Sequence, residues 1–158
     1  MVSETRSEEL HEVATSEPEQ EQLQQVRSDR IERAIAFAKE AAKLCADLKC
    51  RDVRVLDVSK VSPVTDVLVL ATGASPRQMR AVAEQVVEAA EPYDLSPMSS
   101  FKRSEADDRW IALDLIDVVV HLFDEEARGF YDLDGLWGDT PEVKWFEHEV
   151  AGSAAPSS

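Results

Sequence analysis

The stretch VLVLATGASPRQMRAVAE, residues 67–84, decides the kind of fold this chain adopts. Its uncharged aliphatic start predicts a strand that is buried on both faces. Gly73 then makes the turn, Ser75 is a favourable N-cap, and Pro76 suits the first position of a helix. Apolar residues follow at the spacing of a buried helix stripe, namely Met79, Val82, Ala83, Val86, Val87 and Ala90. A buried strand leading into an amphipathic helix is typical of an α/β domain.

A glycine turn between a strand and a helix can also hold phosphate, because the first N–H groups of a helix point at the ligand. This junction has one glycine and matches neither GxxxxGK[ST] nor GxGxxG, so the nucleotide signal is weak. Arg77 and Arg80 lie one turn apart and could meet an anion or an acidic partner. A solvated helix face is the simpler interpretation of both.

The flanking sequence supplies the other elements of a single domain with a mixed β-sheet and packed helices. The capping box Asp29-x-x-Glu32 predicts a helix that runs to about Lys49. Its apolar stripe is Ile31, Ile35, Ala38, Ala42, Cys45 and Leu48. Strands are expected at 52–58, 66–72 and, more weakly, 97–103, and a hairpin at 110–115 and 118–123. We expect a short helix at 124–131, then a turn at 132–138.

Both ends of the chain have the composition of disordered tails. Residues 1–27 are rich in Glu, Gln and Ser without a steady apolar period, which predicts an acidic disordered tail. A short helix within 17–26 is compatible with this composition. The domain spans 28–147, and residues 148–158 form a second low-complexity tail. His11 and His148 therefore belong to no predicted site.

Composition limits the classes of partner. The 158 residues carry a net charge of -15, and the pI is near 4.5. Proteins that bind by neutralising phosphates carry basic patches, so we expect little direct RNA contact and a basic protein as partner. Cys45 and Cys50 fit no zinc or disulfide pattern, and no leader or membrane span is visible. These features predict a cytoplasmic protein with no membrane partner, cofactor or metal.

The expected hairpin has two unlike faces if Ile116-Asp117 is its turn. One face is aliphatic throughout and is therefore core, with Ile111, Leu113, Leu115, Val118, Val120 and Leu122. The other face is mixed, with Trp110, Ala112, Asp114, Val119, His121 and Phe123. A two-residue hairpin turn needs positive φ, which suits Ile116 poorly. A slip of one residue would exchange the two faces.

Asp114 and His121 are diagonal neighbours on the mixed face, about 7–8 Å apart at the backbone. Three interpretations stay open for them: a structural hydrogen bond under a covering helix, a partner-binding patch, or a catalytic or metal site. The catalytic or metal interpretation lacks a nucleophile or a third ligand. Asp132-Leu-Asp134 is a DxD sequence, but it follows a short helix and has no GS loop before it, so it does not predict a two-metal site. Trp137 and Trp145 are expected to seal the core edge.

Three blocks of this sequence, in order and spacing, resemble the Iojap-related ribosomal silencing factor family (RsfS). The blocks are LDVSKVSPVTDVLVLATGASPRQ, W-x3-D-x2-DVVVHLF and EEARGFYDLDGLW, within residues 31–137. The resemblance implies a fold similar to nucleotidyltransferases without their catalytic motif, and therefore no enzyme activity. Relatives commonly have His where this chain has Gln78, Gly-Asp where it has Ile116-Asp117, and Val-Glu-Gly near Ser100-Phe101-Lys102.

The resemblance also implies a translational repressor of the large ribosomal subunit. It would bind ribosomal protein L-fourteen, block joining of the small subunit and slow translation under nutrient limitation. We expect the mixed hairpin face and its neighbours to bind this partner, through Trp110, Asp114, Asp117, His121, Arg128 and Tyr131. A homodimer is left open. The alternative is a metal-dependent nucleotidyltransferase or phosphohydrolase that uses Asp114, Asp117 and His121.

Overall fold

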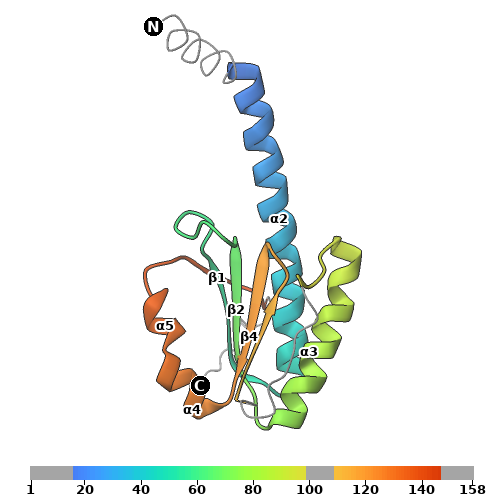
Figure 1. The fold of residues 1–158 in the computed structure, drawn as a ribbon, viewed down its shortest axis with the longest axis vertical. Coiled ribbons are helices and arrows are strands. Elements are labelled where there is room, and N and C mark those ends of the chain that lie inside the picture. The colour runs from blue at the N-terminus through green and yellow to red at the C-terminus, as the bar shows by residue number, and fades with distance from the viewer. Residues whose placement is uncertain (1–15, 99–108, 147–158) are drawn as a thin grey trace, which may run out of the picture.

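The structure is a computed structural model, and it describes residues 16–98 and 109–146. A mixed five-stranded sheet has the order β3-β4-β2-β1-β5. Figure 1 shows α2 (Glu17–Asp47) and α3 (Pro76–Ala90) on one face of this sheet, and α4 (Glu125–Tyr131) and α5 (Leu133–Leu136) on the other. The predicted single α/β domain with a mixed sheet is confirmed. Within the described ranges, no helix is both long and apolar enough to cross a membrane.

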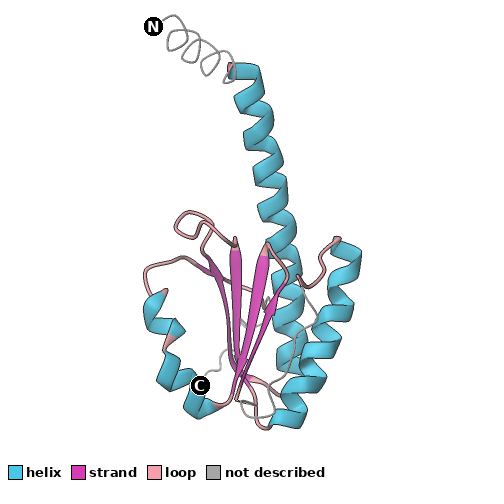
Figure 2. Cartoon of the chain, in the orientation of Figure 1, coloured by secondary structure: helices cyan, strands magenta, loops and turns pink. Residues whose placement is uncertain are grey.

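β2 (Val67–Thr72) is the central strand, and all its residues are buried, as predicted. It pairs in parallel with β4 (Val118–Phe123) and antiparallel with β1 (Arg51–Asp57). The sheet is completed at its edges by β3 (Trp110–Asp114) and the short β5 (Glu142–Val143). Residues on the two faces of β2 belong to two separate apolar clusters, one beneath α2 and α3 and the other beneath α4. Figure 2 shows these three layers.

The junction from β2 to α3 forms as predicted. Ser75 caps the helix, and its Oγ accepts a hydrogen bond from the Gln78 N–H at 3.1 Å. A Cβ at Gly73 would lie 2.2 Å from Met79 Cγ, so only glycine allows this close approach. The Gln78 side chain stabilises the turn. Its Oε1 accepts a hydrogen bond from the Ala74 N–H, and its Nε2 donates one to the Leu48 carbonyl at 2.7 Å.

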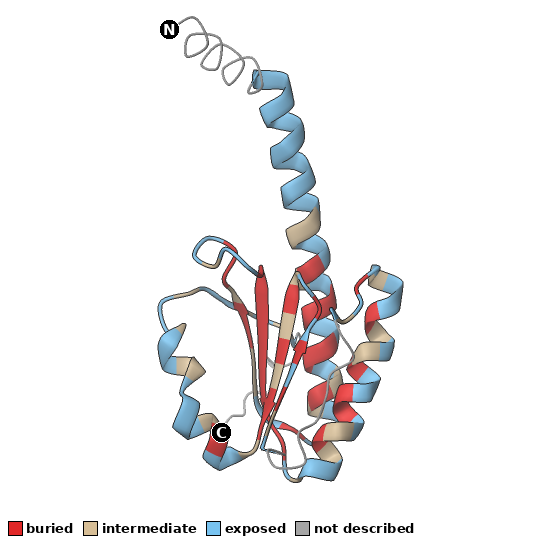
Figure 3. Cartoon of the chain, viewed as in Figure 1, coloured by how far each residue is buried: buried red, intermediate tan, exposed pale blue. Residues whose placement is uncertain are grey.

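The long helix α2 corrects residues 17–27 of the predicted acidic disordered tail, for which the sequence allowed at most a short helix. The helix begins at Glu17, and every residue from Glu17 to Asp29 is helical and exposed (Figure 3). Asp29 does not cap a helix; its carboxylate accepts a hydrogen bond from Gln25 Nε2 one turn earlier. Adding residues to an existing helix is far easier than starting one, and Glu and Gln are good helix formers. Residues 1–15 and 148–158 of the predicted tails lie outside the described residues.

Two further expectations concern short elements. The predicted turn at 132–138 instead contains the single helical turn α5, which Asp132 caps by accepting a hydrogen bond from the Gly135 N–H. Most of the predicted strand at 97–103 lies outside the described residues. Trp137 and Trp145 pack at the edges of the two apolar clusters, as expected.

The hairpin has the predicted register, with Ala112 opposite His121 and Leu113 opposite Val120. The aliphatic face is buried throughout. Ile116 accommodates the turn by adopting φ 74°, in the left-handed region that β-branched residues rarely enter. The Asp117 N–H donates to the Leu115 carbonyl at 2.9 Å, and the Ile116 N–H donates to Asp114 Oδ1 at 2.9 Å. These bonds hold Ile116 in a strained conformation.

We expect Ile116→Gly to stabilise the protein by about 1 kcal/mol, because relief of the strain exceeds the entropy that glycine adds to the unfolded chain. The Ile116 side chain is 52% exposed, so its removal loses little burial. Ile116→Ala is the control, since alanine retains the Cβ that causes the strain. Urea unfolding measures the three proteins, and a glycine variant no more stable than the alanine variant would contradict the strain.

Candidate partner-binding surface

Five aromatic side chains meet where β3 and β4 approach α4, and we call them the aromatic cluster: Trp110, His121, Phe123, Phe130 and Tyr131. The Trp110 ring is centred 4.5 Å from that of Tyr131 and 5.3 Å from that of Phe123. Phe130 packs edge-on against Tyr131 at 5.0 Å. The cluster joins the hairpin to α4 by ring contacts.

The aromatic cluster runs from the core to solvent. Phe123 is fully buried, Trp110 and His121 are half-buried, Tyr131 is 43% exposed and Phe130 is 79% exposed. Helix α4 therefore covers the Phe123 end of the mixed hairpin face, while Ala112 and Asp114 at the other end are exposed. The exposed ends of the cluster and these two strand residues form one candidate surface. Phe130 was missed from the sequence because its exposure depends on how α4 is docked.

His121 bonds to Trp110 in place of Asp114. The Trp110 indole Nε1–H donates to His121 Nδ1 at 3.1 Å, which requires a neutral imidazole with its proton on Nε2. Burial lowers the pKa of His121 to about 4, and the negative charge of Asp114 opposes this shift only in part. His121 is thus a neutral acceptor at physiological pH that fixes the orientation of Trp110.

The structure places Asp117 apart from the aromatic cluster. It is the second residue of the hairpin turn, and its Oδ1 lies 3.9 Å from the Arg30 Nε of α2. Burial, together with the nearby charge of Asp66, raises the pKa of Asp117. Within the described part of the chain, no three His, Cys, Asp or Glu side chains are grouped to hold a metal ion. Asp114, Asp117 and His121 therefore do not form the metal site of the enzymatic alternative.

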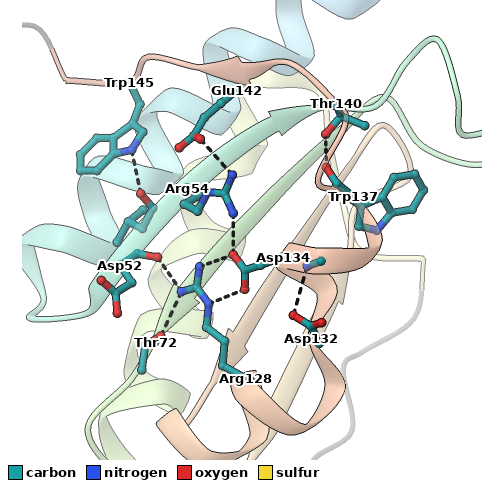
Figure 4. Close-up of polar contacts among 12 residues, drawn as sticks. Asp52, Arg54, Thr72, Arg128, Asp132, Asp134, Trp137, Thr140, Glu142 and Trp145 are labelled. Atoms are coloured by element: carbon teal, nitrogen blue, oxygen red, sulfur yellow. Dashed lines mark hydrogen bonds and ion pairs between the residues drawn. The ribbon is translucent and has the colours of Figure 1, made fainter.

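Arg128 points inward, into a charged network beneath α4 and α5 (Figure 4). Its guanidinium forms a two-point fork with Asp134, with both N–O distances 2.9 Å, and also donates to Thr72 Oγ1. Arg54 of β1 donates to the same carboxylate at 2.7 Å and to Glu142 at 2.9 Å. Only 11% of the Arg128 side chain is exposed. Its place in the structure is to hold α4 and α5 on the sheet.

Asp134 is the centre of this network and was not among the predicted site residues. The hydrogen bonds from Arg128, then those from Arg54, lower the pKa of Asp134 to about 2 despite partial burial. The Asp134 carboxylate of the DxD sequence is thus paired with two guanidinium groups. The DxD sequence was visible, but its pairing with Arg54 could not be predicted because Arg54 lies 80 residues away along the chain.

The fold and this surface define a small α/β protein that presents aromatic side chains on one end of a sheet. The family model described as ribosomal silencing factor during starvation (RsfS) matches residues 31–158. A ribosomal silencing factor RsfS from Bacillus subtilis is 36% identical over 106 residues, covering 67% of this chain and 88% of that protein. The chloroplast protein Iojap of Arabidopsis thaliana is 32% identical over 112 residues, covering 70% of this chain and 45% of that protein.

Solved structures agree with these sequence matches. A crystal structure of a Chromobacterium violaceum protein has a TM-score of 0.60 and 30% identity, covering 66% of this chain and 86% of that chain. A crystal structure from Bacillus halodurans has a TM-score of 0.54 and 28% identity, covering 70% of this chain and 95% of that chain. This chain belongs to the RsfS family of ribosomal silencing factors. The predicted family resemblance is confirmed.

Asp134→Asn should lower the free energy of unfolding at pH 7 by about 2 kcal/mol, because it weakens charged hydrogen bonds and leaves two guanidinium groups without a shared anion. Asp139→Asn is the matched control, since it makes the same change at an exposed residue of the same segment. Urea unfolding at pH 7 measures both variants. Equal stability of the two would show that the network does not hold α4 and α5.

His121 should make the protein less stable as the pH falls. Its folded pKa of about 4 lies below the ordinary value of 6.5, so protons bind the unfolded chain more tightly. The stability that neutral His121 contributes is complete above pH 6.5 and is lost as the pH falls toward 4. The loss is at most about 1.4 kcal/mol per pH unit.

His121→Gln isolates this effect, because glutamine does not titrate while the carboxylates titrate in both proteins. The difference in unfolding free energy between wild type and variant should shrink between pH 7 and 5. A difference that stays constant over this interval would rule out a buried neutral imidazole.

Proposed function

We propose that this chain is a translational repressor that binds the large ribosomal subunit through ribosomal protein L-fourteen and blocks joining of the small subunit under nutrient limitation. The observation that carries the proposal is the family match over residues 31–158, whose description names ribosomal silencing during starvation. This role is regulatory and needs no enzyme activity. It also implies a cytoplasmic location.

The charge of the chain supports a protein partner. A net charge of -15 disfavours affinity built on RNA phosphates and favours a basic ribosomal protein. Little direct RNA contact therefore stays our prediction. A homodimer is left open, as it was from the sequence.

The proposed contact surface is the exposed side of the aromatic cluster together with the exposed Ala112 and Asp114 of β3. Tyr131 and Phe130 supply exposed aromatic area, and Asp114 supplies a charge that a basic partner can approach. Aromatic side chains with charged neighbours are the usual composition of binding hot spots. Trp110 is the inner anchor, because His121 and Tyr131 fix its ring from two sides. Arg128 and Asp134 act from beneath by holding α4 in place.

Sedimentation of purified ribosomal subunits tests the function. Excess protein should move with the large subunit and reduce the formation of whole ribosomes from the two subunits. Whole ribosomes forming to the same extent at excess protein would reject the proposal. For the enzymatic alternative, nucleotide and Mg²⁺ titrations by calorimetry should give no heat.

Substitutions can separate binding from folding at the surface. Trp110→Ala should weaken large-subunit binding by about 2 kcal/mol or more, and because the ring is half-buried it should also lower stability. Phe130→Ala should weaken binding with little change in stability, since the ring is 79% exposed.

Leu23→Ala is the control for Phe130→Ala, because Leu23 is a 67% exposed apolar residue on the outer half of α2. Binding is measured by co-sedimentation and stability by urea unfolding. If Phe130→Ala bound as tightly as Leu23→Ala, the exposed side of the aromatic cluster would be removed from the interface.

A further inference from the structure

A cavity of about 420 Å³ lies at the end of the sheet opposite α4, between α2 and the loop that joins β1 to β2. Figure 1 shows that this end is remote from α4. The lining includes Arg27 and Arg30 from α2, Thr65 and Asp66 before β2, and Asp117 of the hairpin turn. The volume lies within the range of about 300–1,000 Å³ typical of small-molecule sites.

The charged groups of the lining are unequally paired. Arg30 Nε donates to Asp66 Oδ2 at 3.1 Å and lies 3.9 Å from Asp117 Oδ1, so two carboxylates share one guanidinium. Arg27 donates to the Ser59 carbonyl at 3.2 Å, and no carboxylate of the described residues forms an ion pair with it. The cavity therefore has one guanidinium, that of Arg27, without an ion pair to any described carboxylate. It also has one carboxylate, Asp117, that is influenced by Arg30 and by Arg33, which lies outside the lining.

A polar group at the cavity also lacks a partner. Thr65 is 8% exposed, and its buried Oγ1 has no hydrogen-bond partner among the described residues. A buried hydroxyl without a partner destabilises the folded state. A bound water or ion that reaches such a group is one explanation for it in a native structure.

The lining selects the class of ligand by its charges. Two arginines and two aspartates sum to zero, so a simple anion meets Asp66 and Asp117 while a simple cation meets Arg27 and Arg30. A small zwitterion avoids both conflicts. Its carboxylate can form the charged hydrogen bonds that Arg27 lacks, and its ammonium can lie beside Asp117.

We propose that this cavity binds a free α-amino acid, with the ligand carboxylate at Arg27 and the ligand ammonium at Asp117. The site is separate from the aromatic cluster, although the hairpin connects them. Asp117 belongs to the hairpin turn that follows β3, the strand that carries Asp114. The ligand site thus goes beyond the ribosome binding proposed above.

An NMR titration of the full ¹⁵N-labelled chain with each common L-amino acid tests the site. We expect at least one to shift the backbone resonances of Thr65, Asp66 and Asp117 with a dissociation constant of about 1 mM or lower. Its N-acetyl form lacks the ammonium and its amide form lacks the carboxylate, and each should bind about tenfold more weakly or worse. No shifts with any amino acid at about 10 mM, ten times that constant, would overturn the proposal.

Variants test the two ends of the ligand. Arg27→Gln and Asp117→Asn should each weaken binding by about tenfold or more, while Arg77→Gln, at an exposed arginine of α3, should not. Arg27 is exposed, so its variant is expected to fold even if Asp117→Asn does not. Unchanged affinity in Arg27→Gln would overturn the assignment.

Inorganic phosphate is the probe for a plain anion site. Phosphate that binds as tightly as the best amino acid, or an N-acetyl form that binds as tightly as the free one, would overturn the zwitterion. Arg27→Gln should leave co-sedimentation with the large subunit unchanged. The ligand site and the ribosome binding can therefore fail independently.

Discussion

The burial of both faces of β2 is the constraint on which the rest of the structure depends. A strand without a polar face needs cover on both sides, and its parallel pairing with β4 requires a crossover long enough to include α3. Helices α2 and α3 supply one cover through apolar side chains packed on the sheet, mostly Ala and Val together with Phe37 and Met79. The other cover is thinner, since α4 and α5 are short and bring few buried residues.

Charged hydrogen bonds hold this second cover, α4 and α5, which buries few residues on the sheet. Asp134 receives hydrogen bonds from Arg128 and Arg54, so one carboxylate fastens α5 to α4 and both to the sheet. The network is partly shielded, with Arg128 only 11% exposed, and each nitrogen of the Arg128 guanidinium donates a hydrogen bond. Because α4 is held there, Tyr131 reaches Trp110 and Phe130 is left exposed. The aromatic surface is thus a consequence of how the second face of β2 is covered.

Local signals in the sequence predicted much of this arrangement. The β2–α3 unit and the hairpin register follow from apolar runs, a serine cap and strict alternation, which the chain expresses within a few residues. The predicted start of α2 was wrong. The Asp29 capping box was only a local signal, whereas a helix that has already formed extends easily through Glu and Gln. The environments of Arg128 and Asp117 were beyond prediction, since their partners Asp52, Thr72 and Arg30 come from distant elements.

The hairpin connects the two ends of the sheet that carry unlike chemistry. At one end, Phe123 and Trp110 belong to the aromatic cluster; at the other, Asp117 faces Arg30 and the charged cavity. Ile116 is strained and also lines the cavity, and an aspartate on each side of it contributes a hydrogen-bond acceptor to the turn or to β2. Asp114 accepts from Ile116, while the Asp117 carbonyl accepts from the N–H groups of Asp66 and Val67. Hydrogen bonds with Asp114 of β3 and with the start of β2 therefore hold the conformation of this turn. They allow an isoleucine to occupy a position that favours glycine.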